Sequence, residues 1–259
     1  MSAIDCVGGP GTIPTGEGTA ILTVDRVTAG YGHTTILRDV SLRVPAGGVT
    51  ALLGANGVGK TTLLKTIAGL IRPTMGTIGL AGKDVTKLSP HQRDRRGLYL
   101  IPEGRGIFRS LTVRDNLIVQ SERGKENEAI EKATAAFPVL GERLNQLAGT
   151  LSGGQQQMLA VSRAYIRSPK LILIDEASLG LAPIVVDAIF SFLEGVAKQG
   201  AALLIVDQFV ARALQMSTTA YVLRRGEIVY RGSAAALRDG NVFEQYLGTA
   251  DPGAGGSPP

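Results

Sequence analysis

The stretch VTALLGANGVGKT, residues 49–61, decides the fold of this chain. Its apolar beginning, VTALLG, is typical of a strand that is buried on both faces of a parallel sheet. Its second part, GANGVGKT from Gly54 to Thr61, fits the pattern G-x-x-x-x-G-K-[ST] and leads into a helical stretch from Lys60 to about residue 70. This order of strand, glycine loop and helix predicts an α/β fold that binds phosphate at one edge of its sheet.

The residues of this loop have distinct predicted roles in binding a nucleotide. Gly54, Gly57 and Gly59 let the chain wrap so that its N–H groups point inward at phosphate oxygens. We expect Lys60 to supply a positive charge for the β- and γ-phosphates and Thr61 to supply a hydroxyl for Mg²⁺. An ordinary glycine turn is the alternative in a chain with 34 glycines, and the strand and helix that flank the loop disfavour it.

A second strand points to the same edge of the sheet. In LILIDE, residues 171–176, four apolar residues run into Asp175 and Glu176. Ligands of open α/β folds bind at the carboxyl ends of the strands, which is where these carboxylates would lie. We expect Asp175 to hold Mg²⁺ through a water molecule and Glu176 to act as the base or positioner of an attacking water. Such a pattern is common at strand ends, and the phosphate loop is what favours this interpretation.

A third stretch, LSGGQQQMLAVSRA (residues 151–164), has the pattern of a helix that opens on Ser152, Gly153 and Gly154. Glycine is a poor helix former, so a glycine pair at this position needs an explanation. Bare backbone lets a ligand approach the start of the helix closely, and the free N–H groups and the helix dipole favour an anion there. The sequence therefore predicts an anion at this helix start, without identifying it.

Composition limits the class of protein. A chain of 259 residues with 44% hydrophobic content can form one α/β domain, alone or with a small subdomain. Its single cysteine, Cys6, excludes an internal disulfide and a thiolate metal cluster, and it favours a reduced, cytosolic setting. His33 and His91 are far apart in the sequence, which argues against a histidine metal site, and we expect both at the surface. No apolar run reaches the length of a membrane-spanning helix, and no signal peptide is recognised.

The charge does not indicate a nucleic-acid partner. The formal net charge is +5, but no dense stripe of Lys and Arg with interleaved aromatic residues is present. The densest basic stretch is HQRDRRG, residues 91–97, and Asp94 dilutes it. We therefore expect mildly basic surfaces and no nucleic acid.

The chain divides into a body over residues 20–248 and two terminal segments. Residues 1–19 and 249–259 are rich in Gly, Pro and Thr with few large apolar groups, which predicts disorder. In the body we expect antiparallel strands over 21–24 and 40–44, buried strands over 98–101, 171–174 and 203–206, a helix over 185–200 and a hairpin over 221–232. The polar, helical pattern over 113–150 predicts an inserted helical subdomain over about residues 104–165.

The order of these motifs resembles the ATP-binding-cassette (ABC) transporter ATPases. A phosphate loop, then LSGGQ, then an apolar strand that ends in Asp-Glu is specific to that family, whereas the loop by itself is shared with many kinases and GTPases. The resemblance implies an α/β P-loop NTPase core of the ABC ATPase type, an antiparallel β subdomain and an inserted α-helical subdomain. It also implies hydrolysis of ATP with Mg²⁺. Ser152 and Gly154 would then meet the γ-phosphate of an ATP held by a partner chain.

Further residues take their roles from the resemblance alone. Tyr31 matches the aromatic residue that stacks on adenine, and Gln208 matches the switch histidine that senses the γ-phosphate. Glu103 takes the place of a common glutamine at the link between the subdomains and completes the metal environment. Ala177 and Ala182 replace a common proline and aspartate. These departures bear on the rate of hydrolysis and on the affinity between the two subunits of the dimer more than on the function. The implied nucleotide-binding residues are Tyr31, Gly54, Asn56, Gly57, Gly59, Lys60, Thr61, Thr62, Ser152, Gly153 and Gly154; the catalytic residues are Glu103, Glu176 and Gln208; and the metal site holds Thr61, Glu103 and Asp175.

A narrower resemblance concerns the transported solute. The segments GANGVGKTTLLKTIAGL, PEGRGIF, NQLAGTLSGG and SLGLAP together are similar to the ATP-binding subunit of branched-chain amino acid importers. This implies transmembrane permease subunits, a second ATP-binding subunit in a homo- or heterodimer, an indirect link to an extracytoplasmic solute-binding protein, and a place at the cytoplasmic face of the cell membrane. The alternatives are a urea or short-chain amide importer, an exporter subunit, a non-transport ABC protein of ribosomes or DNA repair, and an inactive regulatory subunit.

Overall fold

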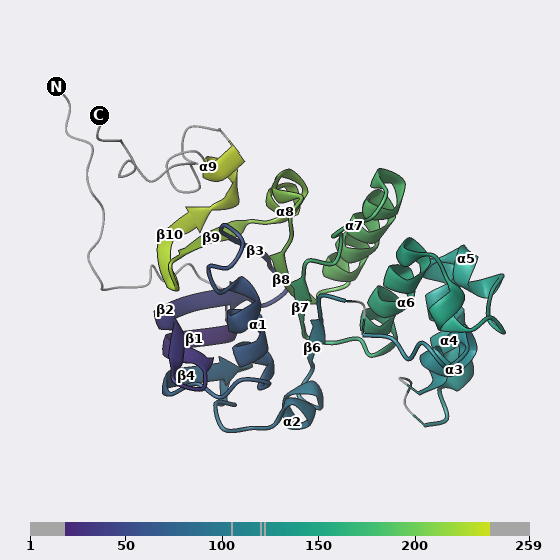
Figure 1. Cartoon of the computed structure of the whole chain (residues 1–259), viewed down its shortest axis with the longest axis horizontal. Coiled ribbons are helices and arrows are strands. Elements are labelled where there is room, and N and C mark those ends of the chain that lie inside the picture. Colours follow the sequence, from purple (N-terminus) through teal and green to yellow (C-terminus); the bar gives the residue numbers. More distant parts are fainter. Residues whose placement is uncertain (1–18, 105, 120, 122, 239–259) are drawn as a thin grey trace, which may run out of the picture.

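The computed structural model describes residues 19–104, 106–119, 121 and 123–238. The disorder predicted for the terminal segments and the predicted end of the body at residue 248 fall outside these residues, apart from residue 19. Figure 1 shows an elongated molecule with the strands at one end and a group of helices at the other. The predicted fold class is confirmed.

A six-stranded sheet forms the centre of the molecule, in the order β10-β9-β3-β8-β7-β6. Strand β3 pairs with β8 and β9, and β7 with β8 and β6, all in parallel, whereas β10 runs antiparallel to β9. All residues of β3, β7 and β8 are buried, as expected of strands covered on both faces. The strands are β3 (Val49–Leu53), β6 (Leu98–Ile101), β7 (Leu171–Asp175), β8 (Ala202–Val206), β9 (Thr219–Arg224) and β10 (Glu227–Ser233).

A four-stranded antiparallel sheet, in the order β2-β1-β4-β5, covers one side of the molecule. Its strands are β1 (Ala20–Tyr31), β2 (Thr34–Pro45), β4 (Met75–Leu80) and β5 (Lys83–Asp84). Both β1 and β2 are longer than the predicted segments. The turn between β9 and β10 joins the two sheets, because the carbonyl of Gly226 accepts a hydrogen bond of 2.8 Å from the backbone N–H of Arg38 on β2.

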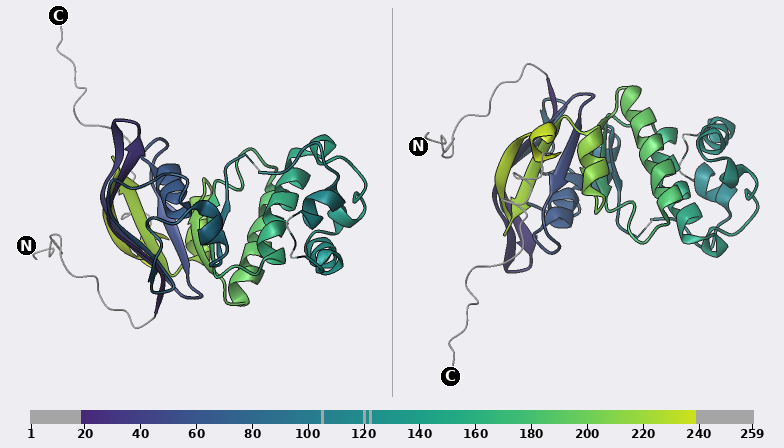
Figure 2. Two further views of the ribbon diagram at one scale, coloured as in Figure 1. Left: turned by 90° about the horizontal axis from the view of Figure 1, so that it is seen from below. Right: turned by 90° about the horizontal axis from the view of Figure 1, so that it is seen from above.

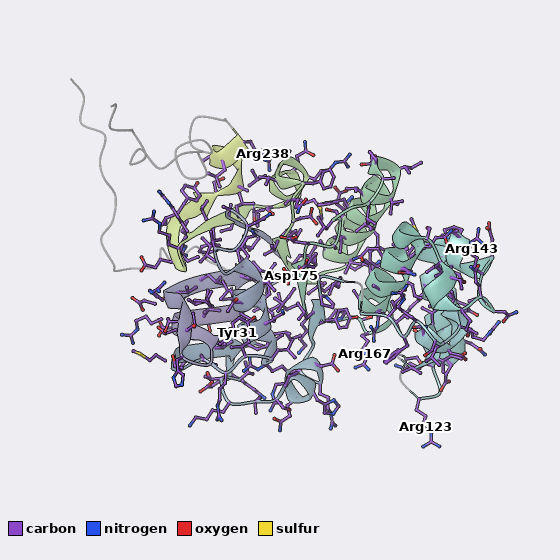
Figure 3. The ribbon with its side chains drawn as sticks, viewed as in Figure 1. Tyr31, Arg123, Arg143, Arg167, Asp175 and Arg238 are labelled. Carbon is purple, nitrogen blue, oxygen red and sulfur yellow. The ribbon has the colours of Figure 1, made fainter. Side chains whose placement is uncertain are left out.

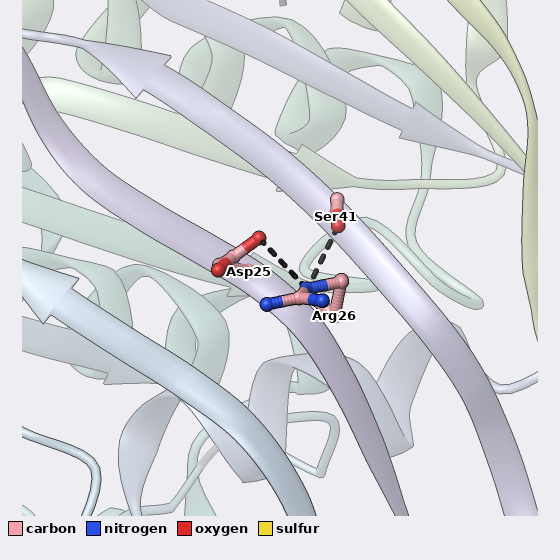
Figure 4. Close-up of polar contacts among 3 residues, drawn as sticks. All are labelled: Asp25, Arg26 and Ser41. Atoms are coloured by element: carbon pink, nitrogen blue, oxygen red, sulfur yellow. Dashed lines mark hydrogen bonds and ion pairs between the residues drawn. The ribbon is translucent and has the colours of Figure 1, made fainter. Parts of the chain in front are cut away.

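A β-bulge interrupts β1 where the sequence pattern of alternating residues breaks. Val24 pairs with Leu42 and Val27 pairs with Val40, so two residues of β1 lie opposite one residue of β2. In Figure 4 these residues are Asp25, Arg26 and Ser41, and the hydroxyl of Ser41 accepts a hydrogen bond of 2.9 Å from the backbone N–H of Arg26. Arg26 has φ 48°, in the left-handed region. The bulge shifts the side-chain alternation by one residue and lets the strand continue to Tyr31.

The helices divide into two groups. The first group lies beside the two sheets and contains α1 (Lys60–Ala68), α2 (Pro90–Asp94), α7 (Pro183–Lys198), α8 (Val210–Met216) and α9 (Ala234–Arg238). A helical lobe at the other end of the molecule contains α3 (Val113–Ile118), α4 (Glu126–Ala136), α5 (Pro138–Gly141), the short 3-10 helix η1 (Ala148–Thr150) and α6 (Gly153–Ile166). Both views in Figure 2 show α7 between this lobe and the strands.

Each part of the molecule has its own apolar core. One core fills the space between the antiparallel sheet, α1 and one face of the six-stranded sheet. A second core lies on the opposite face of that sheet, against α6, α7, α8 and α9. A third core lies within the helical lobe, and Phe192 of α7 packs against both the second and the third core.

The expected basic surface over residues 91–97 is wrong for one residue. Arg93 is only 1% exposed, and its guanidinium donates hydrogen bonds to the carbonyls of Thr66 and Ile67 in the last turn of α1, at 2.9 and 2.6 Å. It also donates to the carbonyls of Leu88 and Thr86. Arg93 is therefore a buried cap for the helix that follows the phosphate loop.

The described helices include none with both the length and the apolar character needed to cross a bilayer. His33 and His91 are exposed, as expected.

Candidate functional site

The phosphate loop depends on three glycines with positive φ. Gly54, Gly57 and Gly59 have φ of 152°, 79° and 111°, values that residues with a side chain rarely adopt. A Cβ on Gly54 would also lie 2.4 Å from the carbonyl oxygen of Leu223 on β9. Around Gly57 the space is open, so a ligand can approach the backbone there. The loop is therefore shaped by its backbone, in line with a cradle for phosphate.

Lys60 begins α1 and turns back over the loop. Its ammonium group donates hydrogen bonds to the carbonyls of Gly54 and Ala55, at 2.8 and 2.9 Å. Burial lowers the pKa of Lys60, and the nearby carboxylates of Glu176 and Asp175 oppose that shift. The cation thus lies at the mouth of the loop between backbone carbonyls, where phosphate oxygens can replace them as acceptors.

Thr61 and Asp175 meet at the end of β7. The hydroxyl of Thr61 donates a hydrogen bond of 3.0 Å to Oδ1 of Asp175, although 114 residues separate them in the sequence. Asp175 is 1% exposed, and burial raises its pKa to about 6, with smaller contributions in the same direction from Glu176 and Glu103. A buried carboxylate that binds a hydroxyl and feels the charge of two further carboxylates is suited to a divalent cation, because the cation stabilises its charged form.

Glu176 is held in a strained backbone conformation. Its φ is 48°, and its backbone N–H donates a hydrogen bond of 2.8 Å to the carbonyl of Val206 at the end of β8. The side chain lines a pocket of about 310 Å³ together with Glu103, Gly104, Ile107, Arg109, Gln156, Gln157 and Leu179. The structure thus places Glu176 and Glu103 around one space and close to Asp175.

Gln208 follows β8 and is exposed. The residue before it, Asp207, is 6% exposed and was not among the predicted site residues. The sequence carried a signal for it, because LLIVD at 203–207 repeats the pattern of LILID at 171–175, an apolar strand that ends in an aspartate. Asp207 contacts Ser178 in the loop that follows Glu176.

Ser152 caps the start of α6. The hydroxyl of Ser152 accepts from the backbone N–H of Gln155, and Gln155 Oε1 accepts from the N–H of Ser152, which is a capping box. Figure 1 shows α6 on the opposite side of β7 from α1. Helix α1, which begins at Lys60, and helix α6, which begins at Gly153, thus lie on different sides of this strand, while Gln156 and Gln157 of α6 line the pocket of Glu176.

The glycine at position 154 has a packing role that the sequence did not reveal. A Cβ at Gly154 would lie 2.9 Å from Cγ2 of Val185 on α7. The absence of a side chain thus lets α6 and α7 pack closely, in addition to leaving the helix start bare. The local sequence around Gly154 does not predict this role, because the contacting residue, Val185, belongs to a different helix.

The remaining predicted residues have different surroundings. Asn56 is exposed at the tip of the phosphate loop, whereas Thr62 is buried in the first turn of α1. Tyr31 is 51% exposed at the turn between β1 and β2. In Figure 3, Tyr31 lies on the antiparallel sheet and Asp175 lies near the middle of the molecule. An aromatic face is thus open at the turn, on the sheet that packs against α1.

The described residues do not form a metal site from protein ligands alone, since no group of three or more His, Cys, Asp or Glu side chains converges among them. The pair of Thr61 and Asp175 suits Mg²⁺ that takes its other ligands from substrate phosphates and water. The arrangement as a whole can hold a polyphosphate chain, a hard cation and a water molecule next to a carboxylate. This is the equipment for hydrolysis of a nucleoside triphosphate.

Comparison with known proteins gives a consistent result. The family model described as ABC transporter matches residues 37–179, which include the phosphate loop, the start of α6 and Glu176. The chain is 40% identical over 232 residues to the high-affinity branched-chain amino acid transport ATP-binding protein BraG of Pseudomonas aeruginosa, a match that covers 88% of this chain and all of that protein.

Two further relatives differ in their described roles. The probable branched-chain amino acid transport ATP-binding protein LivF of Archaeoglobus fulgidus is 35% identical over 236 residues, covering 89% of this chain and all of LivF. The lipopolysaccharide export system ATP-binding protein LptB of Haemophilus influenzae is 34% identical over 240 residues, covering 88% of this chain and 98% of LptB. Among solved structures, an ATP-binding cassette of an ABC transporter in its ADP conformation matches with a TM-score of 0.75 at 27% identity, covering 89% of this chain and 99% of that one.

Proposed function

This chain belongs to the ABC transporter family, and from that premise we propose that it is the ATP-hydrolysing subunit of an importer for branched-chain amino acids. Its activity as an ATP-binding ATPase follows from the family. The direction of transport and the solute are the proposal.

The observation that carries the proposal is the match with BraG. That match is 40% identical and spans all of BraG, whereas the match with LptB is 34% identical over nearly the same part of this chain. LivF, the second relative with a branched-chain amino acid role in its name, also aligns over its whole length. The similarity to LptB makes an exporter the second candidate.

The chemistry proposed for the site uses the contacts described above. The loop N–H groups and Lys60 bind the phosphates of ATP, and Lys60 then exchanges its carbonyl contacts for phosphate oxygens. Glu176 orients a water molecule for attack on the γ-phosphate and accepts its proton, while Gln208 donates a hydrogen bond to that phosphate. Tyr31 stacks on the adenine, and Asn56, Thr62 and Gly153 contribute further contacts to nucleotide.

Mg²⁺ is the metal that the site fits. Thr61 and Asp175 would hold it, with Glu103 completing its surroundings, and the bound cation would neutralise the charge that develops on the phosphates. Asp175 is buried and carries a raised pKa, so its charged form is stabilised by a cation at this place. The exposed carboxylate of Glu103 interacts electrostatically with Asp175, which supports its place near the cation.

The partners proposed for the chain follow from the position of α6. Helix α6 lies on the opposite side of β7 from α1 (Figure 1), and we assign Ser152 and Gly154 to the ATP of a second subunit in a homo- or heterodimer. Permease subunits in the membrane would hold this dimer at the cytoplasmic face, and a solute-binding protein on the other side would deliver the amino acid.

Solute transport by the assembled complex tests the proposal. The chain is purified with its permease subunits and its solute-binding protein and placed in proteoliposomes with MgATP on the side of this chain. We expect ATP-dependent uptake of labelled leucine, isoleucine or valine. Uptake of urea or acetamide without these amino acids would assign the chain to the related amide importers. ATP-dependent release of a lipid substrate, with no uptake of any solute, would make it an exporter subunit.

A further inference from the structure

Asp207 joins the two loops that carry Glu176 and Gln208. Its Oδ2 accepts a hydrogen bond of 3.2 Å from the backbone N–H of Ser178, and its Oδ1 accepts one from the hydroxyl of Ser178. Ser178 is fully buried and lies two residues after Glu176, whereas Asp207 directly precedes Gln208. One carboxylate therefore connects the ends of two neighbouring strands.

The same carboxylate also shapes the loop that holds Gln208. Oδ1 of Asp207 accepts a hydrogen bond of 3.0 Å from the backbone N–H of Phe209, so the chain turns around Gln208. The carbonyl of Gln208 in turn accepts from the N–H of Val210 at 2.9 Å. These contacts fix the backbone of Gln208 and leave its side chain exposed at the edge of the sheet.

Glu176 needs such support because its backbone is strained. A residue with a side chain at φ 48° keeps that conformation only where the surrounding contacts enforce it. The hydrogen bond from Glu176 N–H to the carbonyl of Val206 provides one restraint. The bonds of Ser178 to Asp207 provide a second, because they fix the chain two residues further on.

We propose that Asp207 is a positioning residue for ATP hydrolysis, which holds Glu176 and Gln208 in one arrangement by binding Ser178 and the turn at Phe209. This rests on the proposed roles of Glu176 and Gln208. Asp207 does not touch the nucleotide in this scheme. Its loss leaves ATP binding intact, because the phosphate loop is built from other residues, and it slows the chemical step.

The experiment measures ATP hydrolysis by the assembled transporter with Ser178→Ala and Asp207→Asn. We expect kcat to fall about tenfold or more in each variant, while KM for ATP changes less than about twofold. The double variant should be no slower than Asp207→Asn, because both changes weaken the same hydrogen bonds between Ser178 and Asp207. Ser217→Ala is the matched control, since it deletes another buried serine hydroxyl, which bonds to the carbonyl of Ala213 at 2.7 Å outside the site. We expect wild-type kcat from it.

Two results would overturn the inference. One is wild-type kcat in Ser178→Ala, which deletes the hydroxyl hydrogen bond to Oδ1 of Asp207 and keeps the backbone one to Oδ2, and so tests the side-chain link even if Asp207→Asn does not fold. The other is an equal loss of kcat in Ser178→Ala and Ser217→Ala with equal falls in melting temperature, which would mean a general loss of stability. Glu176→Gln in the same assay separates this inference from the proposed function. A slow Glu176→Gln with a normal Ser178→Ala rejects the positioning role alone, whereas a normal Glu176→Gln rejects the proposed site.

Discussion

Glu176 has a half-buried side chain with a proposed catalytic role, on a backbone that is restrained. Its side chain faces a pocket, while its φ of 48° lies in a region that costs a residue with a side chain about 1–2 kcal/mol. Strain of this kind persists where it places a functional group, and here it directs a carboxylate towards the space next to Asp175.

We expect Glu176→Gln to bind MgATP and to hydrolyse it 10²–10⁴-fold more slowly, which is the usual range for a general base or positioner. Glutamine keeps the shape of the side chain but cannot accept a proton at neutral pH. Turnover of the assembled transporter and binding of a fluorescent ATP analogue measure the two effects. The control is Glu194→Gln on the exposed face of α7, which should keep wild-type turnover. Near-normal hydrolysis by Glu176→Gln would remove this residue from the mechanism.

Asp175 makes the stability of the nucleotide-free protein depend on pH. Its pKa is raised to about 6 in the folded protein, against about 3.9 for an aspartate in an unfolded chain. The folded state thus binds the proton more tightly. The stability this provides is complete below pH 4, and it is lost as the pH rises through 6.

Asparagine at this position removes the titration and can still accept the hydrogen bond from Thr61. Without Mg²⁺ and nucleotide, Asp175→Asn should exceed wild type in unfolding free energy at pH 8 by up to about 3 kcal/mol, from about two pKa units at 1.36 kcal/mol each. The difference should vanish near pH 4. Urea denaturation from pH 4 to 8 measures it. A variant less stable than wild type at pH 8 would contradict the raised pKa.

At this scale the sequence shows residues whose role follows from a local pattern. Lys60, Thr61 and Asp175 were predicted because the loop and the strand end are each contiguous in the chain, and the structure brings all three together. It does not show roles that depend on a contact between distant segments. The packing of Gly154 on Val185 and the link from Asp207 to Ser178 are of this kind. Each contact joins two segments that are far apart in the sequence.

Among the elements, buried parallel strands were the easiest to predict. The segments at β3, β7 and β8 are short, buried along their length and apolar except for Thr50 and Asp175, so composition marks them. Strands β1 and β2 were predicted too short because each has a bulge that shifts the alternation of side chains, at Asp25 and Arg26 in β1 and at Arg38 and Asp39 in β2. Strand β4 was missed, since Gly76 and Gly79 weaken its pattern. Gly76 is required there, because a Cβ would lie 2.3 Å from the carbonyl oxygen of Arg26.

Helix α2 was missed for a different reason. Its basic residues are typical of an exposed charged segment, whereas Ser89 and Gln92 form a capping box that marks a helix start. This helix places Arg93 beneath the end of α1, where the guanidinium donates to the carbonyl of Ile67 and to that of Thr66, which also accepts from the N–H of Gly69.

We expect Arg93→Met to lower the unfolding free energy by about 3 kcal/mol, since it removes the guanidinium donor from buried and half-buried carbonyls. The exposed neighbour Arg96, which bonds to the carbonyl of Gln92 at 3.1 Å, provides the control. Arg96→Met should change the stability by less than about 0.5 kcal/mol. Denaturant unfolding of both variants, with wild type alongside, gives the comparison. Equal effects in the two variants would show that the buried contacts of Arg93 do not dominate.

For the whole molecule, α1 and α6 lie on opposite sides of β7 in Figure 1, and we propose that one site is built from α1 of one chain and the start of α6 of another. Lys60→Met and Ser152→Asp each damage one half of that site. Aspartate caps a helix as well as serine does, so Ser152→Asp keeps α6 but sets a negative charge where the γ-phosphate should approach. Ser152→Asn, a neutral cap, is the control and should retain activity. Gly154 is not suitable for this test, because any side chain there contacts Val185.

Mixing the two inactive variants should restore ATP hydrolysis. In a mixed dimer, Lys60 of one chain meets Ser152 of the other, and that site is undamaged. The double variant mixed with wild type should give an inactive mixed dimer, because each site then has one damaged half. A site built within one chain predicts the reverse in both mixtures. Sedimentation shows that the mixed dimers form. Inactivity of the mixed dimers in both mixtures would mean that two intact sites must act together.

Phe192 packs against two cores and also stacks with Phe137 of the helical lobe, with ring centroids 5.0 Å apart. The chain has no tryptophan. The variant Phe192→Trp would therefore give this chain a single tryptophan, whose fluorescence can be excited selectively at about 295 nm. That tryptophan would lie where the lobe meets the rest of the molecule. Its emission maximum and quenching by iodide would report how far solvent reaches the contact between these two parts through each catalytic cycle, without any attached dye.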